Sequence, residues 1–308
     1  MATTTAGRPV RRERAAPAPR RARRPGVGRT SYLFLVPSLV LFTLAITLPA
    51  VMGIALSFTN SVGFGEFDVT GLTNYVALFS DPAILSSYGF TIGFALVTVL
   101  VVNVVAFLLA VGLTSRIRGK VPLRAVFVLP MVISGIVIAY VFNFLFSNSL
   151  PRWAGAVGFS PLEQSMLADP DLAWVTIVIV TAWQAVPSAL LIYIAGILSI
   201  PAEVYEAASL DGASAGRRLR SITLPLVAGY VLINVVIGFK NFLNAYDIIV
   251  GLTNGGPGTA TRSVAMTIFS GFTGGDYAYQ MANATIFFLI AVVLAVLQIR
   301  LTRGKAAL

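Results

Sequence analysis

EVYEAASLDGASAGRRLRSITLPLV, residues 203–227, is a short charged stretch between two long apolar runs, and it determines how the rest of the chain is organised. Glu203 and Glu206 suit the first turn of a helix, because the amino end of a helix is positive. Asp211 and Gly212 suit its end, where glycine supplies a positive φ. The pattern predicts a helix of about two turns between the two apolar runs.

A second short helix is expected to begin near Ser214 and to end where Leu224-Pro225 opens the next apolar run. The first helix would expose small and aromatic side chains beside its acids, and a surface of this kind fits a groove in another protein. A solvated turn between two spans is the alternative interpretation. The side chains expected on this exposed surface are Val204, Tyr205, Ala207 and Ala208.

The composition indicates a membrane protein. The chain has 308 residues, of which 57% are hydrophobic and only 11% are charged, too few charges for a surface that faces water on all sides. Cysteine and histidine are both absent, which excludes disulfides, thiolate or imidazole metal sites and a Ser-His-Asp triad.

Six apolar stretches reach the roughly 20 residues that a helix needs to cross a bilayer. No alternation of polar and apolar residues suggests a barrel, so we expect an all-α membrane protein with six transmembrane helices. The expected spans are 31–57, 88–113, 123–146, 173–198, 226–250 and 281–301, with a loop over 199–225.

The basic residues give the expected orientation. Residues 1–30 hold nine arginines and several prolines and glycines, which predicts a disordered basic tail rather than a cleaved signal peptide. Nineteen of the 22 Lys and Arg residues lie in this tail, near 119, near 217 or at the carboxyl end. The positive-inside rule therefore places both termini in the cytoplasm. The charges form no single basic face, so nucleic acid is not an expected partner.

The letters IPAEVYEAASLDGASAGRRLRSITLPL resemble the EAA loop of the membrane subunits of bacterial ABC importers. In that family the loop forms a coupling helix that docks onto the ATPase subunit, which favours a docking helix over a solvated turn here. The resemblance implies a type I importer permease fold. Residues implied in ATPase coupling are Glu203, Tyr205, Glu206, Ala207, Ala208, Asp211, Gly212, Ile222, Leu224 and Pro225.

Several further segments resemble the carbohydrate-importing branch of this family, of the maltose and glycerol-phosphate type. They include residues 71–82, residues 127–146, residues 182–201 and the stretch NAYDIIVGLTNGGPGTAT at 244–261. The resemblance implies a permease subunit in the bacterial cytoplasmic membrane, with a sugar or related polyol as solute. Monosaccharide, oligosaccharide, polyol and glycerol phosphate all remain open.

The energy for transport is expected to come from another subunit, because the chain contains no G-x-x-x-x-G-K-[ST] stretch, the phosphate-binding loop of ATPases. The chain is therefore expected to bind no cofactor and to be no enzyme. The resemblance implies two ATP-binding subunits that use ATP and Mg, a second homologous permease subunit that is usually a different chain, and an extracytoplasmic solute-binding protein.

The expected fifth span is the most polar one. On a continuous helix Lys240, Asn244 and Asp247 would form one polar stripe in the outer half of the membrane. The resemblance places Asn244 and Tyr246 in a substrate-contacting region. Helix pairing, or contact with outer headgroups, is the alternative for Lys240 and Asp247. Gln184 and Ser188 on the fourth span, and Asn283 on the sixth, are further candidates that could instead join helices.

Two other functional classes compete with the importer. An ion-coupled secondary carrier would work alone, with Lys240 and Asp247 as a proton relay. An integral-membrane enzyme would need a cluster of catalytic groups, and the sequence offers only these two residues.

Overall fold

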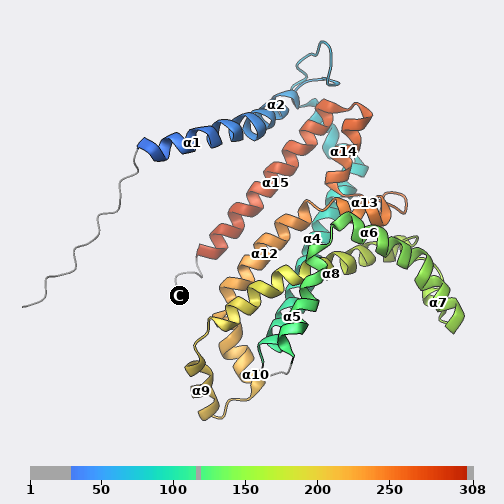
Figure 1. Ribbon diagram of the computed structural model, residues 1–308. Helices are drawn as coiled ribbons and strands as arrows, with labels where there is room; N and C mark the ends of the chain where they lie inside the picture. Colours follow the sequence, from blue (N-terminus) through green and yellow to red (C-terminus); the bar gives the residue numbers. More distant parts are fainter. Residues whose placement is uncertain (1–28, 116–118, 304–308) are drawn as a thin grey trace, which may run out of the picture. The chain divides into compact units, whose positions relative to one another are not determined.

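The computed structural model describes residues 29–115 and 119–303, which are helical apart from their connecting loops (Figure 1). The expected basic tail therefore lies almost wholly outside the described residues. The chain divides into two compact units, Met1–Ala50 and Val51–Leu308, each of which is described by itself.

The first unit contains one apolar helical run. It comprises α1 (Arg29–Phe42), the π-helical segment η1 (Thr43–Thr47) and the beginning of α2 (Leu48–Leu56). The run Leu33–Leu56 has 24 residues and is apolar enough to cross a membrane. The side chains of residues 33–50 are exposed, as on a helix that presents its surface to lipid.

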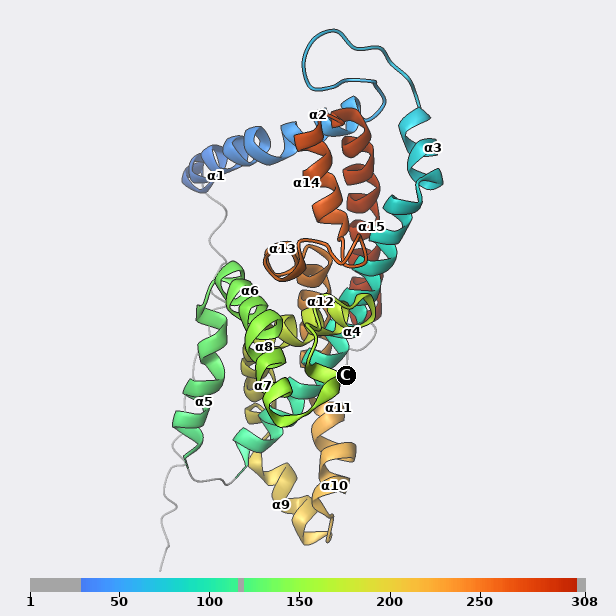
Figure 2. The same ribbon diagram turned by 90° about the vertical axis from the view of Figure 1, so that its right-hand side faces the viewer.

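The second unit contains the other helices. Figures 1 and 2 both place α9 and α10 at one end of this unit and α14 at the other. Its helices are α3 (Thr73–Ser80), α4 (Pro82–Thr114), α5 (Lys120–Val128), η2 (Leu129–Val132), α6 (Gly135–Phe144), η3 (Leu145–Ser149), α7 (Leu150–Val157), η4 (Ser160–Leu162), α8 (Pro170–Leu198), α9 (Ala202–Leu210), α10 (Ala215–Arg218), η5 (Leu219–Thr223), α11 (Leu224–Leu226), α12 (Ala228–Leu243), α13 (Asp247–Thr253), α14 (Val264–Gly274) and α15 (Tyr277–Arg303).

The two long central helices begin in the same way. Asp81 precedes Pro82 at the start of α4, and its side chain accepts a hydrogen bond from the Ala83 amide at 2.9 Å. Asp169 precedes Pro170 at the start of α8 and accepts from the Asp171 amide at 2.8 Å. An aspartate cap followed by proline satisfies free amides and fixes φ for the first turn.

Within the described residues, four helices are long and apolar enough to cross a membrane, and six spans result if each of two bent pairs counts as one. The expected third span, 123–146, bends by 95° between Pro122–Val132 and Gly135–Val157, because Ile133 leaves the helical region. The expected fifth span, 226–250, is wrong at both ends. Helical structure already begins at Ala215, bends by 64° at Val227 and stops at Leu243.

Polar side chains join the central helices. Tyr193 on α8 donates a hydrogen bond to Asn103 on α4 at 2.5 Å, and Asn234 on α12 donates to the Ala189 carbonyl of α8 at 3.1 Å. Both Tyr193 and Asn234 are buried. Such bonds hold helices together where lipid supplies no hydrophobic driving force between them.

The short helix α13 packs on α6 at a close backbone approach. Asn143 on α6 donates to the Leu252 carbonyl of α13 at 2.6 Å. A Cβ added at Gly251 would lie only 2.5 Å from the Cβ of Ala139. The contact therefore requires glycine at this position.

We predict that Gly251→Ala destabilises the protein by about 1–3 kcal/mol, the usual cost of overpacking a tight contact. Thermal unfolding in detergent measures the change. Gly89→Ala is the matched control, because a Cβ at Gly89, in α4, meets no atom within 4 Å. An unchanged midpoint for Gly251→Ala would contradict this packing.

Candidate functional site

The charged stretch folds as expected into a helix that ends at glycine. Helix α9 spans Ala202–Leu210 with Glu203 in its first turn. Gly212 has φ of 71°, and the Ala213 amide donates to the Ala208 carbonyl at 2.9 Å to close the helix end. The sequence signal for this short helix was therefore accurate.

The exposed face of α9 differs from the expected one. Ala208 is only 8% exposed, so it packs inward, and Val204 and Tyr205 are half-buried. Position 208 lies on the inner face of the helix because it is one turn from Val204 and Tyr205, which also face inward. Ala202 and Ser209 are exposed as well. Four of the exposed residues follow an i, i+3, i+4, i+7 pattern and form one continuous ridge: Glu203, Glu206, Ala207 and Leu210.

Two hydrogen bonds tie α9 to the helix that follows it. The hydroxyls of Tyr205 and Thr223 are 3.0 Å apart, and Arg218 donates from Nη1 to Ser209 Oγ at 2.9 Å. A cavity of about 940 Å³ lies between these elements and the end of α4. The two bonds connect α9 directly to α10 and η5.

The second helix of the loop does not stop at Leu224-Pro225 as expected. Chain direction changes only at Val227, and α10, η5 and α11 run through the proline. Pro225 is the second residue of α11 and directly follows the π-helical segment η5 in this run. Ile222 is half-buried, whereas Leu224 and Pro225 are exposed.

A cavity of about 450 Å³ lies between the middle of α8 and the second half of α12, has polar groups among mostly apolar ones, and is called the inner cavity here. Five of the expected pathway residues line it: Gln184, Ser188, Asn244, Tyr246 and Asp247. Its volume falls in the range of about 300–1,000 Å³ that is typical of small-molecule sites.

A helix break shapes this cavity. Residues 244–246 separate α12 from α13, so Lys240, Asn244 and Asp247 do not form one helical stripe as expected. Asn244 donates from its side chain to the Lys240 carbonyl at 2.9 Å and thereby satisfies the end of α12. Gln184 on α8 donates to the Ile133 carbonyl at 3.0 Å. Ile133 is the residue at which the expected third span breaks.

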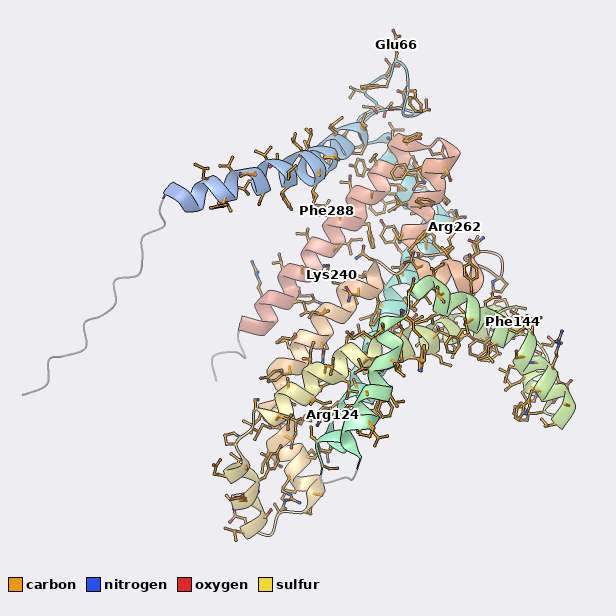
Figure 3. The ribbon with its side chains drawn as sticks, in the orientation of Figure 1. Glu66, Arg124, Phe144, Lys240, Arg262 and Phe288 are labelled. Atoms are coloured by element: carbon orange, nitrogen blue, oxygen red, sulfur yellow. The ribbon has the colours of Figure 1, made fainter. Side chains whose placement is uncertain are left out.

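Two expected pathway residues lie elsewhere in the described structure. Lys240 is exposed on α12 and does not line the inner cavity (Figure 3). Asn283 is fully buried and accepts a hydrogen bond from Tyr88 Oη at 2.9 Å, which joins α15 to α4. Asn283 therefore joins two helices, the alternative that the sequence left open.

The sequence analysis did not select three polar cavity residues, of which Asn234 also bonds to α8. Asn241 lines the cavity, and its polar side chain in an apolar helix was a signal that could have identified it. Thr181 also lines the cavity, and its hydroxyl is buried without a hydrogen-bond partner among the described residues. Threonine is common in membrane helices, so no sequence signal marked it.

A second cavity of about 410 Å³ adjoins the first on the side of α14 and is called the outer cavity here. Tyr246 lines both cavities, and its ring meets Phe269 edge-on with centroids 5.5 Å apart. Arg262 lines the outer cavity and donates from Nη2 to Ser270 Oγ. Tyr246 therefore lies at the boundary of the two cavities, and the pair that it forms with Phe269 is called the aromatic wall here.

The described residues contain no group of three or more Asp, Glu, His or Cys side chains that would hold a metal ion. The inner cavity offers amides, hydroxyls, a tyrosine ring and one carboxylate. This donor set suits binding of a polar organic solute.

Comparison with known proteins identifies the family. A family model described as "Binding-protein-dependent transport system inner membrane component" matches residues 103–303. The chain belongs to this family. The binding-protein-dependent permeases are transport components of the inner membrane, so the predicted multi-pass membrane protein is confirmed. Membership favours the importer over the ion-coupled carrier and the membrane enzyme.

Relatives of this permease extend over nearly the whole chain. The multiple sugar-binding transport system permease protein MsmF of Streptococcus mutans is 33% identical and covers 88% of this chain and 94% of its own length. The trehalose/maltose transport system permease protein MalF of Thermococcus litoralis is 30% identical, over 90% of this chain and 95% of its own length.

A solved structure shares the fold of this permease. It is a crystal structure of a bacterial ABC transporter involved in the import of the acidic polysaccharide alginate. One chain of it matches with a TM-score of 0.78 at 20% identity, over 89% of this chain and 94% of that one. The expected type I ABC importer permease fold is thus confirmed.

We predict that Gly212→Val impairs transport by the assembled system, because a β-branched residue at positive φ costs about 1–2 kcal/mol and shifts the end of α9. Asn tolerates this conformation, so Gly212→Asn should retain most of the activity. Gly216→Ala is the control, since Gly216 has ordinary φ and free space around it. Undiminished transport by an assembled Gly212→Val system would argue against a role for this turn.

Proposed function

We propose that the chain is one membrane subunit of an ATP-driven importer that moves a sugar or related polyol through the bacterial cytoplasmic membrane by alternating access. One observation carries the proposal: the helices that enter and leave the exposed α9 ridge also form the walls of the inner cavity. Helix α8 supplies Gln184 and Ser188, and α12 supplies Asn241.

The helical segments that connect α9 to the inner cavity are short. Ser188 is ten residues from the end of α8 at Leu198, which is about 15 Å of helix. On the other side, η5 and α11 join α10 to α12 with a single bend at Val227. A displacement of α9 by a motor subunit therefore moves both walls of the cavity and changes the side on which it opens.

A carbohydrate fits the chemistry of the inner cavity. Each sugar hydroxyl both donates and accepts hydrogen bonds, and amide side chains offer both functions in return. The tyrosine ring adds an apolar surface for a sugar face. The names of MsmF and MalF, both sugar-transport permeases, support the same class of solute.

The partners follow from this assignment. Two ATP-binding subunits would bind ATP and Mg and dock onto the α9 ridge, because the chain itself has no phosphate-binding loop. A second homologous permease and an extracytoplasmic solute-binding protein complete the importer. The placement of Lys and Arg supports cytoplasmic termini, with α9 on the same side.

We predict that a cysteine at position 207 forms crosslinks to an ATP-binding subunit in native vesicles. The chain has no cysteine of its own, so each crosslink is unambiguous. Ala208→Cys is the matched control, because position 208 faces inward and should not react. Mass spectrometry of the adduct identifies the partner. Failure of Ala207→Cys to capture any ATP-hydrolysing protein would contradict the proposal.

We also predict that Ser188→Trp lowers uptake by tenfold or more, because the indole fills the inner cavity. Uptake into proteoliposomes containing the whole importer measures this loss, and basal ATP hydrolysis shows that the subunits remain assembled. Ile179→Trp is the control, since Ile179 is exposed on the opposite face of the same helix and does not line the cavity. Normal uptake by Ser188→Trp would place the solute path elsewhere.

A further inference from the structure

The inner cavity carries one formal charge among its described lining residues. Asp247, the first residue of α13, is the only acidic or basic side chain there, and all other polar lining groups are amides and hydroxyls or the phenol of Tyr246. The charge of the cavity therefore depends on how this carboxylate is compensated.

No side chain in the described structure pairs with Asp247, although the carboxylate lies in the first turn of α13, whose amino end is positive. Its carboxylate makes no hydrogen bond and no ion pair with another described residue. The two nearest basic residues in the sequence face other places: Lys240 lies outside the inner cavity, and Arg262 lines the outer one, beyond the wall of Tyr246 and Phe269. Figure 3 shows Lys240 on α12 and Arg262 on the loop before α14.

An unpaired carboxylate has opposite effects on neutral and anionic solutes. For a sugar hydroxyl it is a strong acceptor, since hydrogen bonds to a charged group are roughly twice as strong as neutral ones. For a phosphate or carboxylate it is a like charge, and because Asp247 is exposed the two charges repel each other across water. The cavity offers no arginine or lysine to offset that repulsion.

We infer that the inner cavity admits uncharged saccharides or polyols and rejects phosphorylated and acidic ones, with Asp247 as the residue that sets this preference. The inference rests on the proposed function, and it narrows the solutes that the sequence left open by removing glycerol phosphate. Gln184, Asn241 and Asn244 then bind hydroxyls, and Asp247 excludes anions.

The charge of the cavity can be measured without knowing the solute. Ser188→Cys places one thiol in the cavity wall of a chain that otherwise has none. In the assembled importer in detergent, this thiol is treated with a cationic trimethylammonium-ethyl or an anionic sulfonato-ethyl methanethiosulfonate. The labelling rate of each reagent is divided by its rate with a free thiol in solution, which removes the difference in intrinsic reactivity. Labelling is measured as the increase in mass of this chain.

The cationic reagent should react faster than the anionic one. Asp247→Asn should slow the cationic reagent and speed the anionic one, each by about fivefold, the effect of one unit charge about 4 Å away in water. Lys240→Gln, which removes a charge outside the cavity, should leave the ratio unchanged. Equal normalised rates for both reagents in the Ser188→Cys protein, or no effect of Asp247→Asn, would overturn the inference.

A second measurement tests the solute itself. Proteoliposomes containing the whole importer and its binding protein are given maltose, trehalose, glucuronate and glycerol phosphate in turn. Uptake restricted to the neutral sugars supports the inference, and uptake of glucuronate or glycerol phosphate overturns it. Uptake of none of them counts against the proposed function, while the labelling ratio still decides the charge of the cavity.

Discussion

A broken helix inside a bilayer must find partners for its free backbone groups within the protein, because lipid supplies none. This chain breaks two helices next to the inner cavity, at Ile133 and at residues 244–246. Gln184 binds the carbonyl freed at the first break, and Asn244 binds the end of α12 at the second. The inner cavity and the helix breaks thus depend on each other, because the side chains that bond to the free backbone carbonyls also line the cavity.

The breaks also separate rigid parts from parts that can move. Helices α4 and α8 pack along their length and are fixed by the bond between Tyr193 and Asn103. Helix α12 is joined to α8 by Asn234, yet both of its ends are bends or breaks. Under the proposed function, a force that enters at α9 would reach the cavity through α8 and through the bent run from α10 to α12, where the chain is already interrupted.

The two cavities carry side chains of opposite charge. Arg262 lines the outer cavity and Asp247 the inner one, with the pair of Tyr246 and Phe269 between them. The aromatic wall keeps the two charged groups in separate spaces.

The sequence alone determined the family resemblance, the all-helical membrane class, the six apolar runs and the short helix ending at Gly212. These features depend on local composition and on backbone preferences that a few neighbouring residues fix. Only the tertiary structure decided that Ala208 faces inward, that Asn283 joins α15 to α4, and that Lys240 lies outside the cavity. It also revealed Thr181 and the break that separates Asn244 from Asp247. The physical reason is that a polar residue in a membrane helix satisfies the same sequence pattern whether it binds a neighbouring helix or a solute, and packing between distant segments makes that choice.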